Sequence, residues 1–172
     1  MANQYYTEAA IQRLRETAFE PYELQAIKKS IGKWQSIATG IGIDRGLINC
    51  SLCKLYNLAC MQQSVLEDAV WGTGMVYRKS CPVMILTGTH GCRNSPYTYF
   101  LDHFGSKHRN AHVVQALCGR CRFIAYVEMD FLYTVYDLAI GTCELSNKEV
   151  LGLLEHLMRS VQTRIEYERM VS

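Results

Sequence analysis

Apolar residues recur at three- and four-residue intervals along most of this chain, and this spacing constrains its fold more than any other feature. The longest run lies between positions 113 and 138 and is followed by Gly141. Another run, from Val150 to Ile165, is preceded by Ser146 and Glu149, which have the spacing of a capping box. Because a period near 3.6 residues places such side chains on one face of a helix, residues 110–172 are predicted to form two long helices.

The first forty residues carry the same period in two shorter runs. Thr7 is placed to cap a helix over residues 7–19, and Pro21 separates this helix from a second one that ends at Gly40. Residues 1–40 are therefore predicted to form a helical hairpin.

Residues 41–109 lack a long helical period and contain five of the eight cysteines. Short helices are predicted at 57–71 and after the pair Ser95 and Pro96, and the apolar, partly β-branched run at 81–88 predicts a brief strand. A chain of 172 residues is long enough for one domain with its own core. The predicted fold is mainly α, a single domain of about five helices around an irregular, zinc-stabilised cysteine knuckle in the Cys-rich centre at 41–109.

Two cysteines in the stretch "NCSLC", Cys50 and Cys53, have the C-x2-C spacing with which a tight turn presents two thiolates to one metal ion. Two later cysteines stand beside proline or glycine, where the backbone can direct them toward the same ion. Zinc takes four ligands in a tetrahedron and favours thiolate in structural sites. The predicted zinc ligands are Cys50, Cys53, Cys81 and Cys92, with His90 and Cys60 as alternates.

Other interpretations of the cysteines remain open, namely disulfides, small buried hydrophobic residues, or a catalytic or redox pair. The N-terminal residues show no basic segment followed by an apolar one, so we expect a reducing, cytoplasmic location, where disulfides rarely persist. Cys118 and Cys121, in "LCGRC", fall inside the long helical pattern. Positions three apart share a helix face, so these two thiols could lie in the core, which is favoured, or bind metal together.

The segments "SIGKWQSIATGIGIDRGLINCSLCKLYN" and "CPVMILTGTHGCRNSPY", at 30–57 and 81–97, resemble a family of small, mostly uncharacterised proteins found largely in bacteriophages. In relatives, the C-P motif lies closer to the first cysteine pair and often follows another cysteine, whereas here Ser80 precedes Cys81 and 27 residues separate Cys81 from Cys53. The resemblance implies a zinc-binding, phage-encoded protein in the host cytoplasm, and it implies no reaction. The matching positions are Trp34, Gly40, Asp44, Gly46, Asn49, Cys50, Leu52, Cys53, Cys81, Pro82, Gly91, Cys92, Ser95, Pro96 and Tyr97.

Positive charge is concentrated in the middle of the chain. Residues 71–125 contain seven Lys or Arg and one acidic residue, although the net charge of the whole chain is only +2. Such a region attracts phosphates or an acidic partner, and the tyrosines within it could stack on nucleic-acid bases. Equally, the charges could be dispersed over the surface and the aromatic rings could pack inside. The candidate surface consists of Arg78, Lys79, Arg93, Tyr97, Tyr99, Lys107, His108, Arg109, Arg120 and Arg122.

The sequence contains no arrangement of residues that is typical of catalysis. It lacks a Gly-rich phosphate loop, a G-x-S-x-G motif and a dinucleotide fingerprint. Asp102 and His103 adjoin without a nucleophile. Glu128, Asp130 and Asp137 are predicted to lie on or near the solvated face of a helix, and a carboxylate site is the open alternative. No apolar run approaches the roughly 20 residues of a membrane-spanning helix, so no membrane partner is expected.

These features favour a non-enzymatic, zinc-stabilised binding protein, which by the phage resemblance would engage or inhibit a host protein such as a defence factor. A nucleic-acid or nucleotide binder that uses the basic region at 71–125 is the first alternative. A zinc-dependent hydrolase is the second, and it requires an open coordination position and a nearby carboxylate. The sequence specifies no oligomeric state.

Overall fold

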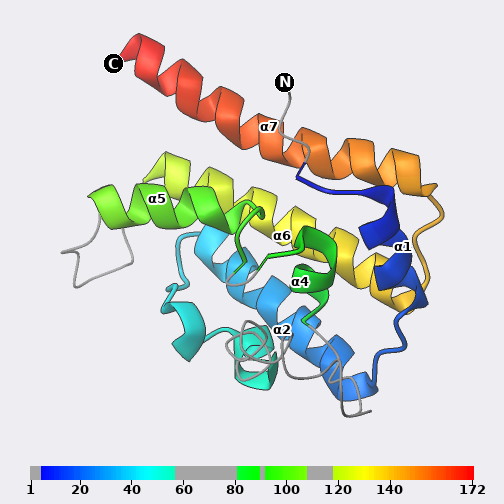
Figure 1. The fold of residues 1–172 in the computed structure, drawn as a ribbon. Coiled ribbons are helices and arrows are strands. Elements are labelled where there is room, and N and C mark those ends of the chain that lie inside the picture. Colours follow the sequence, from blue (N-terminus) through cyan, green and yellow to red (C-terminus); the bar gives the residue numbers. More distant parts are fainter. Residues whose placement is uncertain (1–4, 57–80, 90–91, 108–117) are drawn as a thin grey trace, which may run out of the picture.

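The computed structural model of this chain describes residues 5–56, 81–89, 92–107 and 118–172. These residues are mostly helical and include no strand, so the mainly α prediction is confirmed (Figure 1). None of the helices in these ranges combines the length and the hydropathy that crossing a membrane requires. The elements are α1 (Glu8–Glu16), α2 (Pro21–Ala38), the 3-10 helix η1 (Gly46–Ile48), α4 (Pro82–Thr87), α5 (Tyr97–Lys107), α6 (Gly119–Ile140) and α7 (Asn147–Val171), and residues 51–56 are also helical.

Helix α6 lies at the centre of the fold. It packs against α1, α2, α4, α5 and α7, and its contact with α2 is the most extensive. In Figure 1, α7 lies on one side of α6 and α2 on the other, while α5 runs beside the first part of α6. Because α6 is contacted by several helices, it buries a broad face instead of a narrow stripe. The largest fully buried side chains are Tyr6, Phe100, Phe131, Ile11, Leu14, Ile27, Ile37, Leu86, Ile124, Leu132, Leu138 and Leu154.

The predicted capping residues occupy the helix ends. Thr7 Oγ1 accepts a hydrogen bond from the backbone N–H of Ala10 (3.1 Å) at the start of α1. Ser146 and Glu149 form a reciprocal capping box at the start of α7, with bonds of 3.2 and 2.8 Å. Gly141 ends α6 with φ 76°, a left-handed conformation that glycine adopts without a steric penalty. These caps satisfy backbone groups that have no partner inside the helix, and they confirm the predicted starts of α1 and α7 and the predicted end of α6, whereas α1 ends at Glu16, earlier than predicted.

The strand predicted at 81–88 is wrong, because this segment forms α4. Pro82 stands at the first helical position, where its fixed φ and missing N–H are tolerated, and Gly88 closes the helix with φ 66°. Every residue of α4 except Ile85 is buried. An element that is buried on nearly all sides has a continuous apolar sequence, and such a run does not distinguish a short helix from a strand.

Other parts of the fold also differ from the sequence prediction. Helix α1 packs on α4, α6 and α7, whereas α2 packs along α6, so the first two helices are not arranged as the expected hairpin. The centre at 41–109 is more helical than predicted, because it includes α4, whereas α5 confirms the helix predicted after Ser95 and Pro96. Helix α6 begins at Gly119, so Cys118 is its extended N-cap residue and Cys121 lies in its first turn, instead of both lying in the interior of a longer helix. The helix predicted at 57–71 lies outside the described residues.

Candidate functional site

The loop that leads to Cys50 is held in place by Asp44. One carboxylate oxygen of Asp44 lies 2.5 Å from Lys33 Nζ on α2 and accepts a hydrogen bond from the Gly46 N–H (3.1 Å). The other oxygen accepts a hydrogen bond from the Tyr97 hydroxyl on α5 (3.1 Å). Gly46 has φ 57°, which favours glycine at this turn. These bonds connect the loop to α2 and α5 and so position Cys50 between them.

Cys50 and Cys53 form the turn that their spacing predicts. Cys50 directly precedes the helical residues 51–56, and its Sγ accepts a hydrogen bond from the backbone N–H of Cys53 (3.4 Å). The side chains of the two cysteines also interact. That interaction, together with burial, raises the pKa of the Cys50 thiol far above its ordinary value. In the absence of metal, Cys50 is therefore a neutral thiol.

The other two predicted ligands lie near this turn. Cys92 has a left-handed backbone (φ 56°), which is uncommon for a residue other than glycine, and its side chain interacts with that of Cys53. This hydrogen bond lowers the pKa of Cys92, but burial and the nearby Cys81 thiol raise it, and the net shift is upward. Cys81 is buried at the N-cap of α4. We call these four residues, Cys50, Cys53, Cys81 and Cys92, the cysteine cluster.

The structure brings the cysteine cluster together only in part. Cys53 interacts with two of the other members, and Cys81 is close enough to influence the pKa of Cys92. The four sulfur atoms are not, however, all within 4.8 Å of one another. Among the described residues, a different group of potential ligands has all its ligand atoms within this distance. A zinc site at the cysteine cluster therefore stays a prediction.

A cavity of about 220 Å³ adjoins the cysteine cluster, and Glu128 on α6 is one of its lining residues. The prediction that Glu128 is solvated is wrong, because this side chain is only 3% exposed. The reason is the enclosure of α6 by several helices. The Glu128 carboxylate accepts a hydrogen bond from the Tyr97 N–H (2.9 Å), and burial raises its pKa to about 8. At neutral pH, most Glu128 side chains are thus protonated.

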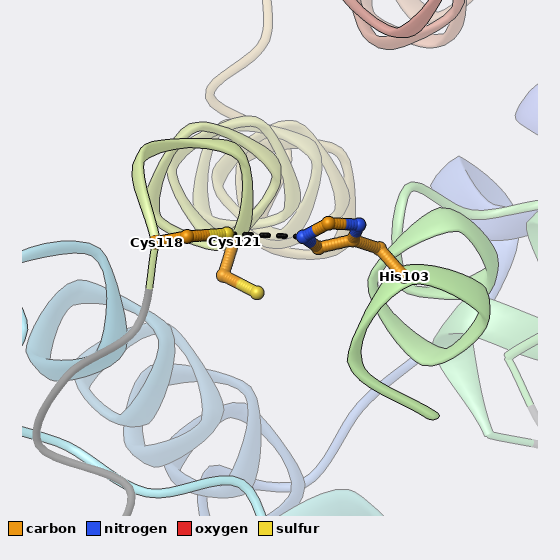
Figure 2. A group of neighbouring side chains, drawn as sticks. All are labelled: His103, Cys118 and Cys121. Atoms are coloured by element: carbon orange, nitrogen blue, oxygen red, sulfur yellow. Dashed lines mark hydrogen bonds between the residues drawn. The ribbon is translucent and has the colours of Figure 1, made fainter. Parts of the chain in front are cut away.

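A second group of potential ligands consists of His103, Cys118 and Cys121, which we call the His–Cys–Cys group. Figure 2 shows His103 extending from α5 toward the start of α6, where the two cysteines lie. The ligand atoms of the three residues all lie within 4.8 Å of one another, and His103 Nε2 is 3.0 Å from Cys118 Sγ. Cys121 is fully buried, and burial raises its pKa to about 12. The His–Cys–Cys group could hold a metal ion.

Arg120 contacts the His103 ring on the side opposite the cysteines. Its Nη1 lies 3.2 Å from His103 Nδ1, and its Nε donates a hydrogen bond to the Glu168 carboxylate on α7. A guanidinium group can only donate, so Nδ1 accepts and the ring proton is on Nε2, directed at Cys118. This arrangement links α5, the start of α6, and α7.

No protein-family model, curated protein or solved structure matches this chain. The resemblance to a phage protein family therefore stays a prediction, and so does every property that it implies.

Part of the predicted basic surface falls on described residues. Arg93 and Arg122 are exposed. The Tyr97 ring packs edge-on against Trp34, with ring centroids 5.3 Å apart, and the Tyr99 hydroxyl accepts a hydrogen bond from a side chain of α7 (2.6 Å). These two tyrosines thus make contacts inside the protein. Outside the described residues lie Arg78, Lys79, His108 and Arg109, the alternate ligands Cys60 and His90, and the side chain of Lys107.

Sequence reasoning did not recognise His103 as a potential ligand. It considered His103 only as a neighbour of Asp102, and it placed Cys118 and Cys121 within a helix. One signal was available: Gly119 follows Cys118 and is a weak helix former, so a helix could begin there and present both cysteines at its first turn. The proximity of His103 arises from the packing of α5 on α6, which no local pattern encodes.

Proposed function

We propose that this chain is a non-enzymatic binding protein whose centre is stabilised by zinc at the cysteine cluster. One observation carries the proposal. Cys53 interacts with Cys50 in its own turn and with Cys92, which comes from a segment about forty residues later in the chain. Cysteines from separate segments that converge on one place beside a cavity are a typical arrangement for a structural zinc site.

Four thiolates would fill the four positions that zinc offers. No position would then remain for a water molecule or a substrate, so the ion would serve structure and not catalysis. Zinc binding to such a site contributes directly to folding free energy, because the unfolded chain has no preformed site. The zinc hydrolase alternative is disfavoured on the same ground, since it requires an open position.

The binding role is supported by an exposed apolar face on α6. Tyr126, Tyr133 and Ile140 are spaced seven residues apart and therefore lie on one side of the helix, where their side chains are 54%, 46% and 36% exposed. Aromatic residues are enriched at protein interfaces. The nucleic-acid alternative has less support, because Tyr97 and Tyr99, the tyrosines predicted to stack on bases, make internal contacts. If the resemblance to phage proteins holds, the partner is a host protein.

The experiment that tests the zinc centre compares wild type with Cys53→Ser. We expect purified wild type to contain zinc and all its cysteines as free thiols once denatured with a chelator. Cys53→Ser should lose the zinc of the cysteine cluster and lower the melting temperature, because Cys53 contacts two other ligands. Elemental mass spectrometry, a thiol assay and thermal denaturation provide the readouts.

Cys143→Ser is the matched control, because Cys143 is a half-buried cysteine outside both groups of potential ligands. It should keep the metal content of wild type. A Cys53→Ser protein that retains all its zinc and its melting temperature would contradict the proposal, and a low thiol count in wild type would indicate disulfides instead.

A further inference from the structure

We propose that the His–Cys–Cys group binds a divalent metal ion of the zinc class, at a site separate from the cysteine cluster. The ligands would be Nε2 of His103 and the thiolates of Cys118 and Cys121. This proposal does not rest on the proposed function, because the two groups share no residue and either site can exist without the other.

Binding of a metal ion requires only a small movement of the three ligand side chains. A tetrahedral zinc ion with ordinary Zn–N and Zn–S bond lengths separates its nitrogen and sulfur ligands by about 3.6 Å and two sulfur ligands by about 3.8 Å. In the structure the three ligand atoms lie within 4.8 Å of one another, and Nε2 and the Cys118 Sγ are 3.0 Å apart. The change from 3.0 Å to the metal-bound distance is within the range of side-chain rotation, so α5 and α6 can keep their places.

The start of α6 suits two thiolates. Cys118 is the N-cap residue and Cys121 the third residue of the helix, the same spacing with which the two members of a capping box meet. The positive end of the helix dipole is located here, and it favours negatively charged sulfur. Arg120, between the two cysteines, adds a positive charge.

Binding of the metal ion releases two protons. The metal ion displaces one proton from each thiol, and both protons go to water. The imidazole stays neutral, and its proton moves from Nε2 to Nδ1, because Nε2 becomes the ligand atom. Nδ1 then no longer accepts from Arg120, so Arg120 rotates away from the ring while its bond to Glu168 remains available.

A hollow of about 330 Å³ between α5, α6 and α7 adjoins the Arg120 side of the His103 ring, and it is lined by His103, Arg120 and Gln162 but by neither cysteine. The described residues supply three ligands, so a water molecule or another donor would complete the tetrahedron. A bound ion would connect α5 to α6 through direct bonds, in addition to the apolar packing between them.

Cadmium-113 NMR of the cadmium-loaded full chain tests the proposal without any variant. Each bound ion gives its own resonance, and a site with two sulfur ligands resonates well upfield of a site with four. We expect a resonance in the range of two sulfurs and one nitrogen. A folded wild-type protein that gives no such resonance would overturn the proposal.

Variants then assign the resonance. His103→Ala and Cys118→Ser should each remove it and reduce the metal content by one ion per chain, whereas Cys143→Ser and Cys53→Ser should leave it in place. If the resonance persists in His103→Ala, the assignment to this group is wrong. Loss of a four-sulfur resonance in Cys53→Ser reports on the proposed zinc centre, so failure of one site is distinguishable from failure of the other.

Discussion

Glu128 is a carboxyl group placed in the interior of the protein, on the central helix. Its hydrogen bonds with the Tyr97 N–H and the Ser95 side chain offset only part of the cost of removing a charge from water. Burial therefore raises its pKa to about 8, and the neutral form is favoured across most of the physiological range. A titratable group in this position makes the stability of the protein dependent on pH.

We predict that Glu128→Gln removes a decline in stability between about pH 5 and about pH 7.5. The unfolded chain loses the Glu128 proton near the ordinary pKa of 4.5, whereas the folded protein keeps it until about pH 8. Within that window the folded state binds more protons, so wild type loses stability as pH rises, with a limiting slope of roughly 1.4 kcal/mol per pH unit. Glutamine does not titrate and can still accept the bond from Tyr97. Urea unfolding at a series of pH values measures the difference.

The control for this experiment is Glu166→Gln, which removes an exposed carboxylate on α7. Its pH dependence should be parallel to that of wild type. Equal slopes for wild type and Glu128→Gln would mean that the buried carboxyl does not control stability in this range.

At the scale of elements, glycine has opposite effects in two helices. Gly88 ends α4 with φ 66°, and a side chain there would be strained although space is free around it. Gly32 lies within α2 at an exposed position, and a side chain there would also meet nothing within 4 Å. The same substitution to alanine therefore tests backbone conformation alone.

We predict that Gly88→Ala destabilises the protein by about 1 kcal/mol, because alanine in a left-handed conformation is strained. Gly32→Ala should stabilise it by about 0.5–1 kcal/mol, because alanine favours the helix interior. Chemical denaturation of the two variants measures both changes. Equal signs for the two changes would contradict the assignment of Gly88 as the end of α4.

The helices that sequence analysis predicted correctly are those whose ends carry local signals. Thr7 and the pair Ser146 and Glu149 act within four residues of their own position, so their effect is visible in the sequence. The strand predicted in place of α4 was wrong because a helix buried on nearly all sides lacks the amphipathic period. The prediction that Glu128 is solvated was wrong for a related reason, since the burial of a residue on α6 depends on which other helices pack against it.

In the candidate sites, too, local features could be predicted and features set by packing could not. The turn between Cys50 and Cys53 could be predicted because it lies within four residues of sequence. The approach of Cys92 depends on the positions of several elements, and the sequence indicated it only through the turn context of this cysteine beside Gly91, which the resemblance to known motifs then supported. His103 had neither a local signal nor a motif, and only the packing of α5 on α6 places it beside Cys118.

At the scale of the whole molecule, we predict that the apolar face of Tyr126, Tyr133 and Ile140 binds a protein. The double variant Tyr126→Lys and Tyr133→Lys should fold like wild type, since both rings are substantially exposed, and should lose the partner that immobilised wild type captures from a nuclease-treated bacterial lysate. Tyr167→Lys, which alters an exposed tyrosine on α7, is the control and should retain it.

The dependence of binding on salt concentration distinguishes a protein partner from a nucleic acid. Capture through an apolar face should persist at high ionic strength, whereas binding to nucleic acid weakens steeply as salt rises. Capture from an untreated lysate that both variants retain, and that high salt or nuclease treatment abolishes, would favour the nucleic-acid alternative over a protein partner.

The central place of α6 has a consequence for the chain as it is synthesised. Helix α2 is complete at Ala38, but α6, its most extensive contact, begins only at Gly119. At about 5–20 residues per second, the ribosome takes roughly 4–16 s to add the residues between them. Throughout that interval the apolar faces of α1 and α2 emerge from the exit tunnel without the helix that covers them. We therefore expect the nascent chain to bind chaperones until α6 has left the ribosome.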